Sequence, residues 1–214
     1  MPDAILPSSE DADIEDIILS HGLRGMDRVR GALPADYCSR AARMILGNPG
    51  CVLIGTGFPV AGSFETDGPI GAIALYRVLE RLGYEPIFGC APPISRVLGD
   101  DFRTLEIPIL SWQATVAIVD QALADIRPAL ILSIERPGVA QDGRYYNMRG
   151  RDISDSLAKF DLFFNRCECA TIAVGDGGNE IGMGNIYAEL SQLDITPSVT
   201  TCGELLIATV SNWG

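Results

Sequence analysis

The chain has 214 residues, 47% of them hydrophobic, which suits one α/β domain with a sizeable core and leaves little room for two. Its formal net charge of −12 argues against nucleic acid and anionic membranes as partners, because both would require a basic face. Six scattered cysteines without a CxxC spacing and a single histidine indicate neither a zinc site nor a disulfide framework.

The start of the chain is rich in proline, serine and acids. We expect residues 1–11 to form a disordered tail ahead of a domain at 12–214. Signal and transit peptides are basic or poor in acids, so this acidic start matches neither. No apolar run approaches the roughly 20 residues that span a bilayer. We therefore expect a cytoplasmic protein.

Apolar periodicity and the positions of glycine and proline predict helices that alternate with short strands. The predicted helices begin near residue 14 and then cover 34–46, 67–82, 92–98, 112–126, 153–166 and 178–190. The predicted strands cover 50–55, 84–90, 105–110, 129–134, 170–175 and 205–210. This alternation is typical of an α/β fold, and we expect a single three-layer domain with a mostly parallel sheet. A helix normally follows the last strand of such a fold, so we expect the closing helix to be missing after Gly214.

One long segment, 138–152, has no periodicity and is rich in arginine and tyrosine. Long loops of this kind inside a compact domain are usually functional or disordered. Two adjacent tyrosines among arginines are unusual in a disordered linker, so we expect a binding loop or lid. Its polar candidates for holding a substrate are Arg144, Asn147 and Arg149.

The most informative stretch is 171–184, where an apolar run stops on a glycine and leads into Asp176, Asn179 and Glu180. Its loop carries glycines at 175, 177, 178, 182 and 184. Glycines permit positive φ angles and let a ligand approach the backbone closely. The plainer interpretation is a strand-to-helix turn in which Asp176 is the helix N-cap.

Other predicted strands also end in polar residues. They are followed by Glu65 and Asp67, by Glu135 and Arg136, and by Asn212. Ligands of open parallel sheets bind outside the carboxyl ends of the strands, so these side chains are expected to share one site. Asp67 has a second interpretation as the N-cap of the helix that comes after it.

Acids gathered at one edge would repel one another unless protons or a cation intervened. Carboxylates at this density suit Mg²⁺ or Mn²⁺, and the expected ligands are Glu135, Asp176 and Glu180. Arginines opposite them would hold a carboxylate or phosphate group. A Walker motif and a GxGxxG motif are absent, and one histidine leaves little room for a Ser/His/Asp triad.

Six segments carry a resemblance to a known family. They are 55–59 (GTGFP), 65–69 (ETDGP), 133–138 (SIERPG), 142–150 (DGRYYNMRG), 175–184 (GDGGNEIGMG) and 210–214 (VSNWG). In this order they resemble the D-glutamate cyclase C-terminal domain family over about residues 20–214. The resemblance implies conversion of D-glutamate to 5-oxo-D-proline with loss of water.

Cyclisation requires a base for the α-ammonium and a cation or acid at the γ-carboxylate. The expected catalytic residues are Asp176, Glu180, Glu65 and Asp67. The expected substrate-binding residues are Arg136, Arg144, Asn147, Arg149, Asn179 and Asn212. Mg²⁺ or Mn²⁺ is the expected cofactor, held by the three metal ligands named above.

Two other functions fit the same residues. Acids with a divalent ion also suit a metal-dependent phosphatase or hydrolase that acts on a small acidic metabolite. A module that binds an acidic metabolite without turning it over is the third alternative, because a resemblance of fold does not determine function. Each alternative has a small molecule as its partner, and a homo-oligomer is left open.

Overall fold

The inner strands of the central sheet are short apolar runs that are largely buried on both faces. In β1 (Cys51–Thr56), Val52 and Ile54 pack into one core while Leu53 packs into the other. Parallel sheets are covered by helices on both sides, which explains why these strands lack a polar face. The computed structural model describes residues 9–20, 22, 24–60 and 62–209.

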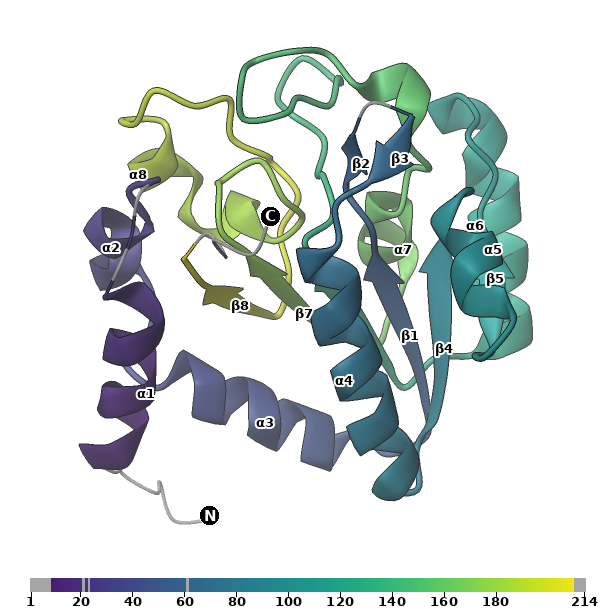
Figure 1. Cartoon of the computed structure of the whole chain (residues 1–214), viewed down its shortest axis with the longest axis horizontal. Helices are drawn as coiled ribbons and strands as arrows, with labels where there is room; N and C mark the ends of the chain where they lie inside the picture. Colours follow the sequence, from purple (N-terminus) through teal and green to yellow (C-terminus); the bar gives the residue numbers. More distant parts are fainter. Residues whose placement is uncertain (1–8, 21, 23, 61, 210–214) are drawn as a thin grey trace.

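The sheet has six strands, and every neighbouring pair is parallel (Figure 1). Its order is β5 (Thr104–Glu106), β4 (Glu85–Cys90), β1, β6 (Leu130–Ile134), β7 (Ala170–Gly175) and β8 (Glu204–Ile207). The chain builds outward from β1 to one edge and then returns to build outward from β6 to the other. The strand order therefore reverses between β1 and β6, which is where doubly wound sheets bind ligands.

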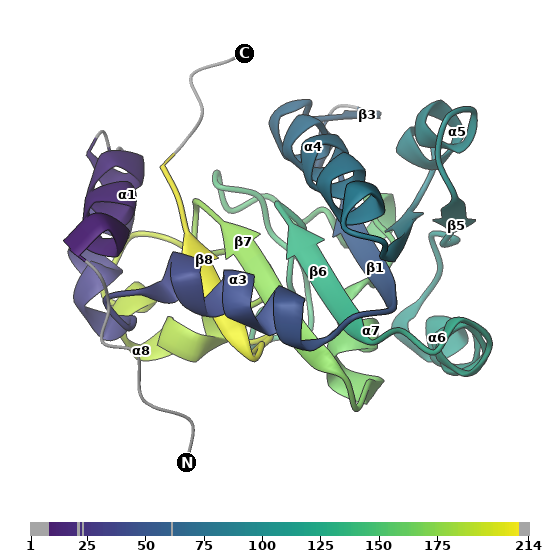
Figure 2. The same cartoon turned by 90° about the horizontal axis from the view of Figure 1, so that it is seen from below.

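Helices cover both faces of the sheet, as Figure 2 shows from below. One face carries α3 (Tyr37–Gly47), α4 (Asp67–Arg81) and α5 (Ile94–Gly99), and the other carries α6 (Trp112–Ile126) and α7 (Asp161–Arg166). Beside β8 lie α1 (Ser9–Leu19), α2 (Met26–Val29) and α8 (Tyr187–Leu190). The expected three-layer α/β domain with a parallel sheet is confirmed.

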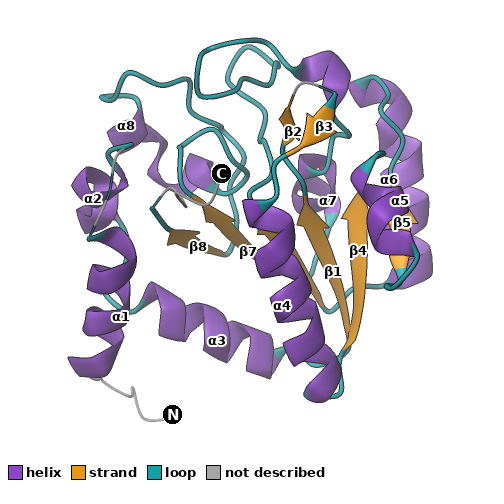
Figure 3. Cartoon of the chain, in the orientation of Figure 1, coloured by secondary structure: helices purple, strands orange, loops and turns teal. Residues whose placement is uncertain are grey.

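The remaining elements are short. A hairpin of β2 (Pro59–Val60) and β3 (Ser63–Phe64) follows β1. The 3-10 turns within the described part of the chain are η1 (Arg30–Ala32), η2 (Ser154–Ser156) and η3 (Met183–Ile186). Figure 3 shows that long loops gather above the carboxyl ends of the strands. Among the residues that the structure describes, no helix combines the length and apolar character that crossing a membrane requires.

The predicted helix at 153–166 is wrong over its first half. Only η2 and α7 are helical there, because Phe160 is fully buried against the sheet. A side chain at Gly55 would lie 2.2 Å from the Phe160 ring, and one at Gly89 would lie 2.9 Å from it. The ring thus fills space that two strand glycines leave open, and this packing overrides local helix propensity.

The predicted helix at 178–190 is wrong over 178–182, and it is helical from Met183 to Leu190, where α8 directly follows η3. Gly178 and Gly182 have φ angles of +92° and +95°, which a right-handed helix cannot contain. The N-cap interpretation of Asp176 is therefore wrong as well. Asp67 is the first residue of α4, inside the helix, and not its N-cap.

Several boundaries differ from the prediction. β5 stops at Glu106, before Pro108, which cannot donate to a strand ladder. The hairpin of β2 and β3 was not predicted. The helix α1 begins at Ser9, and β8 ends at Ile207, before the predicted end of the last strand. The rest of the expected tail and Asn212 lie outside the described residues and stay predictions.

Candidate functional site

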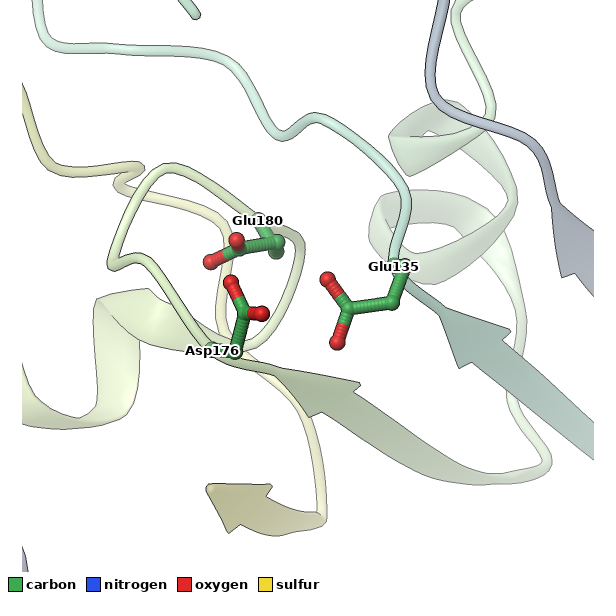
Figure 4. Close-up of side chains that lie close together, drawn as sticks. All are labelled: Glu135, Asp176 and Glu180. Carbon is green, nitrogen blue, oxygen red and sulfur yellow. The ribbon is translucent and has the colours of Figure 1, made fainter. Parts of the chain in front are cut away.

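Three acids meet at the carboxyl ends of β6 and β7. Glu135 directly follows β6, Asp176 directly follows β7, and Glu180 lies on the glycine-rich loop that comes next. One oxygen of each lies within 4.8 Å of the others. Figure 4 shows the carboxylates pointing toward one another from their separate segments. Adjacent parallel strands thus bring together the three residues that the sequence predicted as metal ligands.

The backbone of Glu135 has a conformation that is unusual for a residue other than glycine. Its φ angle is +52°, which is uncommon for a residue with a side chain and costs on the order of 1 kcal/mol or more. Its N–H donates to the Val174 carbonyl at 3.0 Å, which ties the end of β6 to β7. On the other side, a side chain at Gly68 of α4 would come within 2.8 Å of the Glu135 Cβ. Strain of this kind is typical of functional positions.

The glycine-rich loop folds around the carboxylate of Glu180. Its two oxygens accept hydrogen bonds from the N–H groups of Gly177 at 3.0 Å and Gly178 at 2.8 Å. A Cβ at Gly177 would lie 2.6 Å from the Met148 Sδ and 2.9 Å from Glu180 itself. The loop can therefore hold this carboxylate only because glycine stands at position 177.

Burial and the charges of neighbouring acids raise the pKa of all three acids. Burial, followed by the charge of Asp176, raises the pKa of Glu180 to about 7. Desolvation, followed by the charges of Glu180 and Asp176, raises the pKa of Glu135 well above its ordinary value. Burial also raises the pKa of Asp176, although Arg24 opposes the shift. Raised carboxyl pKa values mean that the cluster favours either protons or a bound cation.

Arg24 is a site residue that sequence reasoning missed. It lies between α1 and α2, and its Nη1 donates to Asp176 Oδ1 at 2.5 Å. The two residues are 152 positions apart in the chain. A lone arginine between two N-terminal helices gives no local signal of function, so only the folded chain could reveal this contact.

An acidic cavity of about 520 Å³ opens beside the cluster. Its walls are formed by Arg24, Phe58, Pro59, Val60, Glu65, Glu135, Asn147, Met148, Arg149, Arg151, Asp152, Ile153, Asn179 and Glu180. The end of the 138–152 loop therefore borders the acids and brings arginines to them. This volume lies in the range typical of small-molecule sites.

Glu65 and Asp67 lie on the α4 side of the site. Glu65 lines the acidic cavity, and desolvation followed by the charge of Asp67 raises its pKa. The charge of Asp67 also contributes to the raised pKa of Glu135. Its Oδ1 accepts a hydrogen bond from the N–H of Gly68 at 3.0 Å. Both predicted catalytic acids are therefore close enough to the cluster to influence its charge.

Asn147 and Asn179 both line the acidic cavity. The Oδ1 of Asn147 accepts hydrogen bonds from the N–H groups of Arg149 at 2.9 Å and Arg151 at 3.1 Å, and so shapes the loop. Asn179 Nδ2 donates to the Tyr146 carbonyl at 2.7 Å. Its Oδ1 is buried without a hydrogen-bond partner among the described residues. Buried polar atoms are rarely left unpaired, so this oxygen is a further candidate ligand.

The three predicted arginines lie in different places. Arg149 lines the acidic cavity. Arg144 is exposed and does not line this cavity itself, but it pairs at 3.5 Å with Asp152, which does. Arg136 is only 2% exposed, and its terminal nitrogens donate to the carbonyls of Gly57 and Ala158, each at 2.8 Å. The geometry favours Arg149, together with Arg24, for contact with an anionic substrate.

The cluster fits a hard divalent cation. Such ions prefer carboxylate and carbonyl oxygens, and Mg²⁺ keeps several waters that a substrate can displace. The three carboxylates are close enough for small side-chain rotations to place one oxygen of each on a single ion. The unpaired Asn179 Oδ1 adds an acceptor on the same loop. The donors are therefore of the right type for Mg²⁺ or Mn²⁺.

Comparison with known proteins identifies the family of the chain. The profile of the family described as "D-glutamate cyclase-like, C-terminal" matches residues 14–214. The mitochondrial D-glutamate cyclase of Homo sapiens is 32% identical over 200 residues, which cover 81% of this chain and 32% of the human protein. The chain thus spans about a third of the length of this relative. It belongs to the D-glutamate cyclase-like, C-terminal family.

Proposed function

We propose that the chain is a D-glutamate cyclase-like hydro-lyase that converts D-glutamate to 5-oxo-D-proline and water. The observation that carries this proposal is the cluster of three acids with raised pKa values beside a cavity lined by arginines. Membership of the family and the name of the human relative support it. A dicarboxylic amino acid has the charges that such a cavity would recognise.

In the reaction, the α-nitrogen attacks the γ-carboxyl carbon, and one γ-oxygen leaves as water with two protons from the ammonium. A residue near the cavity must accept a proton before it is passed on. Glu65 suits this step because it lines the cavity and its pKa is raised by desolvation and the charge of Asp67. Arg149 and Arg24 would hold the α-carboxylate by charge-assisted hydrogen bonds.

Glu135, Asp176 and Glu180 would hold a divalent ion, Mg²⁺ or Mn²⁺, which as a Lewis acid would draw charge from the γ-carboxylate. These acids would otherwise repel the carboxylates of the substrate. Asn179 would contribute its Oδ1 to the ion or to the substrate, because this atom is otherwise unpaired. The remaining residues of the 138–152 loop would exclude water from the closed site.

The test is a turnover assay on the full chain with D-glutamate, L-glutamate and a panel of phosphate esters, each with Mn²⁺, with Mg²⁺ and with a chelator. We expect 5-oxo-D-proline to form from D-glutamate, and formation to depend on the divalent ion. Release of phosphate without any 5-oxoproline would select the phosphatase alternative. Tight binding of D-glutamate without turnover would select the binding module.

The proposal includes a small-molecule substrate as the partner of the chain, with neither nucleic acid nor membrane. The acidic composition supports this choice, because both of those surfaces attract basic proteins. The cytoplasmic location stays a prediction from the acidic start of the chain, and the homo-oligomer stays open.

A further inference from the structure

A second cavity, which we call the apolar cavity, lies outside the carboxyl ends of β1, β4 and β5. Its volume is about 300 Å³, and its walls are mainly apolar, with Phe64, Ile94, Ile109 and Leu157 among them. Of the described residues that line it, Arg136 alone is charged. The proposed reaction of D-glutamate makes no use of this cavity.

The apolar cavity and the acidic cavity share part of their walls. Pro59, Val60 and Ile153 line both of them. Val60 and Ile109 are large apolar side chains that are 42% and 38% exposed. Exposed apolar groups beside a ligand site mark further binding surface. A molecule that is bound at the acids could therefore extend past this shared wall into the apolar cavity.

The residues that line the apolar cavity determine what kind of chemical group it can bind. D-Glutamate is charged at its ammonium and at both carboxylates, so no part of it matches apolar walls. A second carboxylate would find little to bind, because the terminal nitrogens of Arg136 already donate to Gly57 and Ala158. The Nε of Arg136 exposes less than 1 Å² and is out of reach. The chemistry of the cavity selects an uncharged, apolar group.

We propose, building on the proposed cyclisation, that the preferred substrate is a γ-amide of D-glutamate whose amide nitrogen carries an apolar group. The apolar cavity binds this group. The α-nitrogen forms its bond to the γ-carboxyl carbon, and the bond from that carbon to the amide nitrogen breaks. The departing amine takes both protons that the α-ammonium releases. Neither an oxidant nor a second reactant is required.

The chemistry of the leaving group supports the amide. A free γ-carboxylate is anionic and resists attack by a nucleophile, whereas an amide carbonyl is neutral. Binding energy from an apolar group that does not react can also be used to position the reacting atoms. The apolar cavity would supply this energy at the leaving-group end of the substrate.

The experiment compares three compounds with the full chain in the presence of Mn²⁺: D-glutamate, D-glutamine and the γ-isobutylamide of D-glutamate. All three yield 5-oxo-D-proline, and only the last carries an apolar group. We expect kcat/KM for the isobutylamide to exceed that for D-glutamine by more than about tenfold, as is typical when a hydrophobic pocket is filled. Isobutylamine should appear in equal amount to 5-oxoproline.

The second part of the experiment uses a variant in which a larger side chain fills the apolar cavity. Ile109→Trp places a large ring in the apolar cavity at a half-exposed position, and should lower the ratio of isobutylamide to D-glutamine turnover at least tenfold. Leu46→Trp, at an exposed position of α3 outside the lining of this cavity, should leave the ratio as it was. Equal turnover of the two amides, or a preference that survives Ile109→Trp, would overturn the inference while D-glutamate cyclisation still supports the proposed function. Failure of all three compounds would overturn both.

Discussion

Asp176 pairs with Arg24 and does not cap a helix. Its replacement should therefore affect turnover more than stability. Asp176→Asn keeps the size of the side chain and removes its charge, so we expect turnover to fall by at least about a hundredfold with the fold retained. Asp176 is buried, and desolvation raises its pKa even though it pairs with Arg24. Losing the ion pair is therefore offset by losing a desolvated charge, and the melting temperature should change little. Melting temperature and 5-oxoproline formation should be measured on the same preparation.

The control for this change is Asp120→Asn. Asp120 pairs with Arg166 on the surface, so the variant removes the same charge and an ion pair far from the acids. It should retain both turnover and melting temperature. If Asp176→Asn melts early but cyclises D-glutamate at the parent rate, the residue has a structural role only.

Arg24 stands where a cation would neutralise Asp176, and the two should compete. Arg24→Gln removes a positive charge beside the acids, so we expect Mn²⁺ to bind at least about threefold more tightly. Arg24→Lys keeps the charge and should bind Mn²⁺ nearly as the parent does. Titration of the Mn²⁺ paramagnetic resonance signal measures both. Weaker binding in Arg24→Gln would show that the arginine supports the ion site and does not oppose it.

Arg149 and Arg144 form a matched pair on one loop. Both side chains are exposed, but only Arg149 lines the acidic cavity, whereas Arg144 pairs with Asp152. Loss of one partner of a desolvated charge pair costs about 2 to 5 kcal/mol of binding. Arg149→Ala should therefore raise the KM or Kd for D-glutamate by well over tenfold, and Arg144→Ala should change it little. Equal effects in calorimetric titrations would contradict this assignment.

At the scale of elements, the conformation of the glycine-rich loop depends on its glycines. Gly177→Ala would bring a methyl group within 3 Å of Met148 and Glu180. We expect at least tenfold lower turnover and a lower melting temperature, because the loop must open to relieve the contact. Scanning calorimetry and the turnover assay measure the two effects.

Gly71→Ala is the control for the loop. Gly71 lies inside α4, and a Cβ there would meet nothing within 4 Å. Alanine favours the helix by roughly 0.5–1 kcal/mol over glycine. This variant should melt slightly higher and keep its activity. A neutral outcome for Gly177→Ala would mean that the loop adapts and does not need glycine at this position.

At the scale of the whole molecule, the acids should make stability depend on pH. The pKa of Glu180 rises from 4.5 to about 7 in the folded chain, so the folded state binds this proton more tightly than the unfolded state. The stabilisation is complete below the unfolded pKa and is lost as the pH rises through about 7. The metal-free protein should therefore lose stability over this range. Mn²⁺ should raise the melting temperature more at about pH 8 than at about pH 5.

Glu180→Gln is the check on this pH dependence. The variant should show a smaller loss of stability between the same two pH values. Some loss should remain, because burial also raises the pKa of Asp161 to about 6, with the same sign. An unchanged pH profile, measured by calorimetry in a chelator, would show that Glu180 is not the group that titrates.

The sequence by itself determined the strands and the polar residues directly after them. The inner strands are apolar runs that can be stable only when they are buried on both faces, so the parallel sheet could be predicted from the sequence. Because the carboxyl ends of parallel strands share an edge, the meeting of Glu135 with Asp176 and Glu180 could be predicted from their positions after two strands. The family resemblance was also evident in the order of the motifs.

Only the tertiary structure decided the remainder. Phe160 packs against Gly55 and Gly89, and this packing prevents the first half of the helix predicted at 153–166 from forming. No local sequence pattern indicates a contact between such distant segments. Loop conformations likewise determine that Arg24 pairs with Asp176. They also determine that Arg149 lines the acidic cavity while Arg144 does not. Loop conformations and long-range ion pairs are set by the summed packing of the whole chain, whereas strands and their ends are set by short-range apolar patterns.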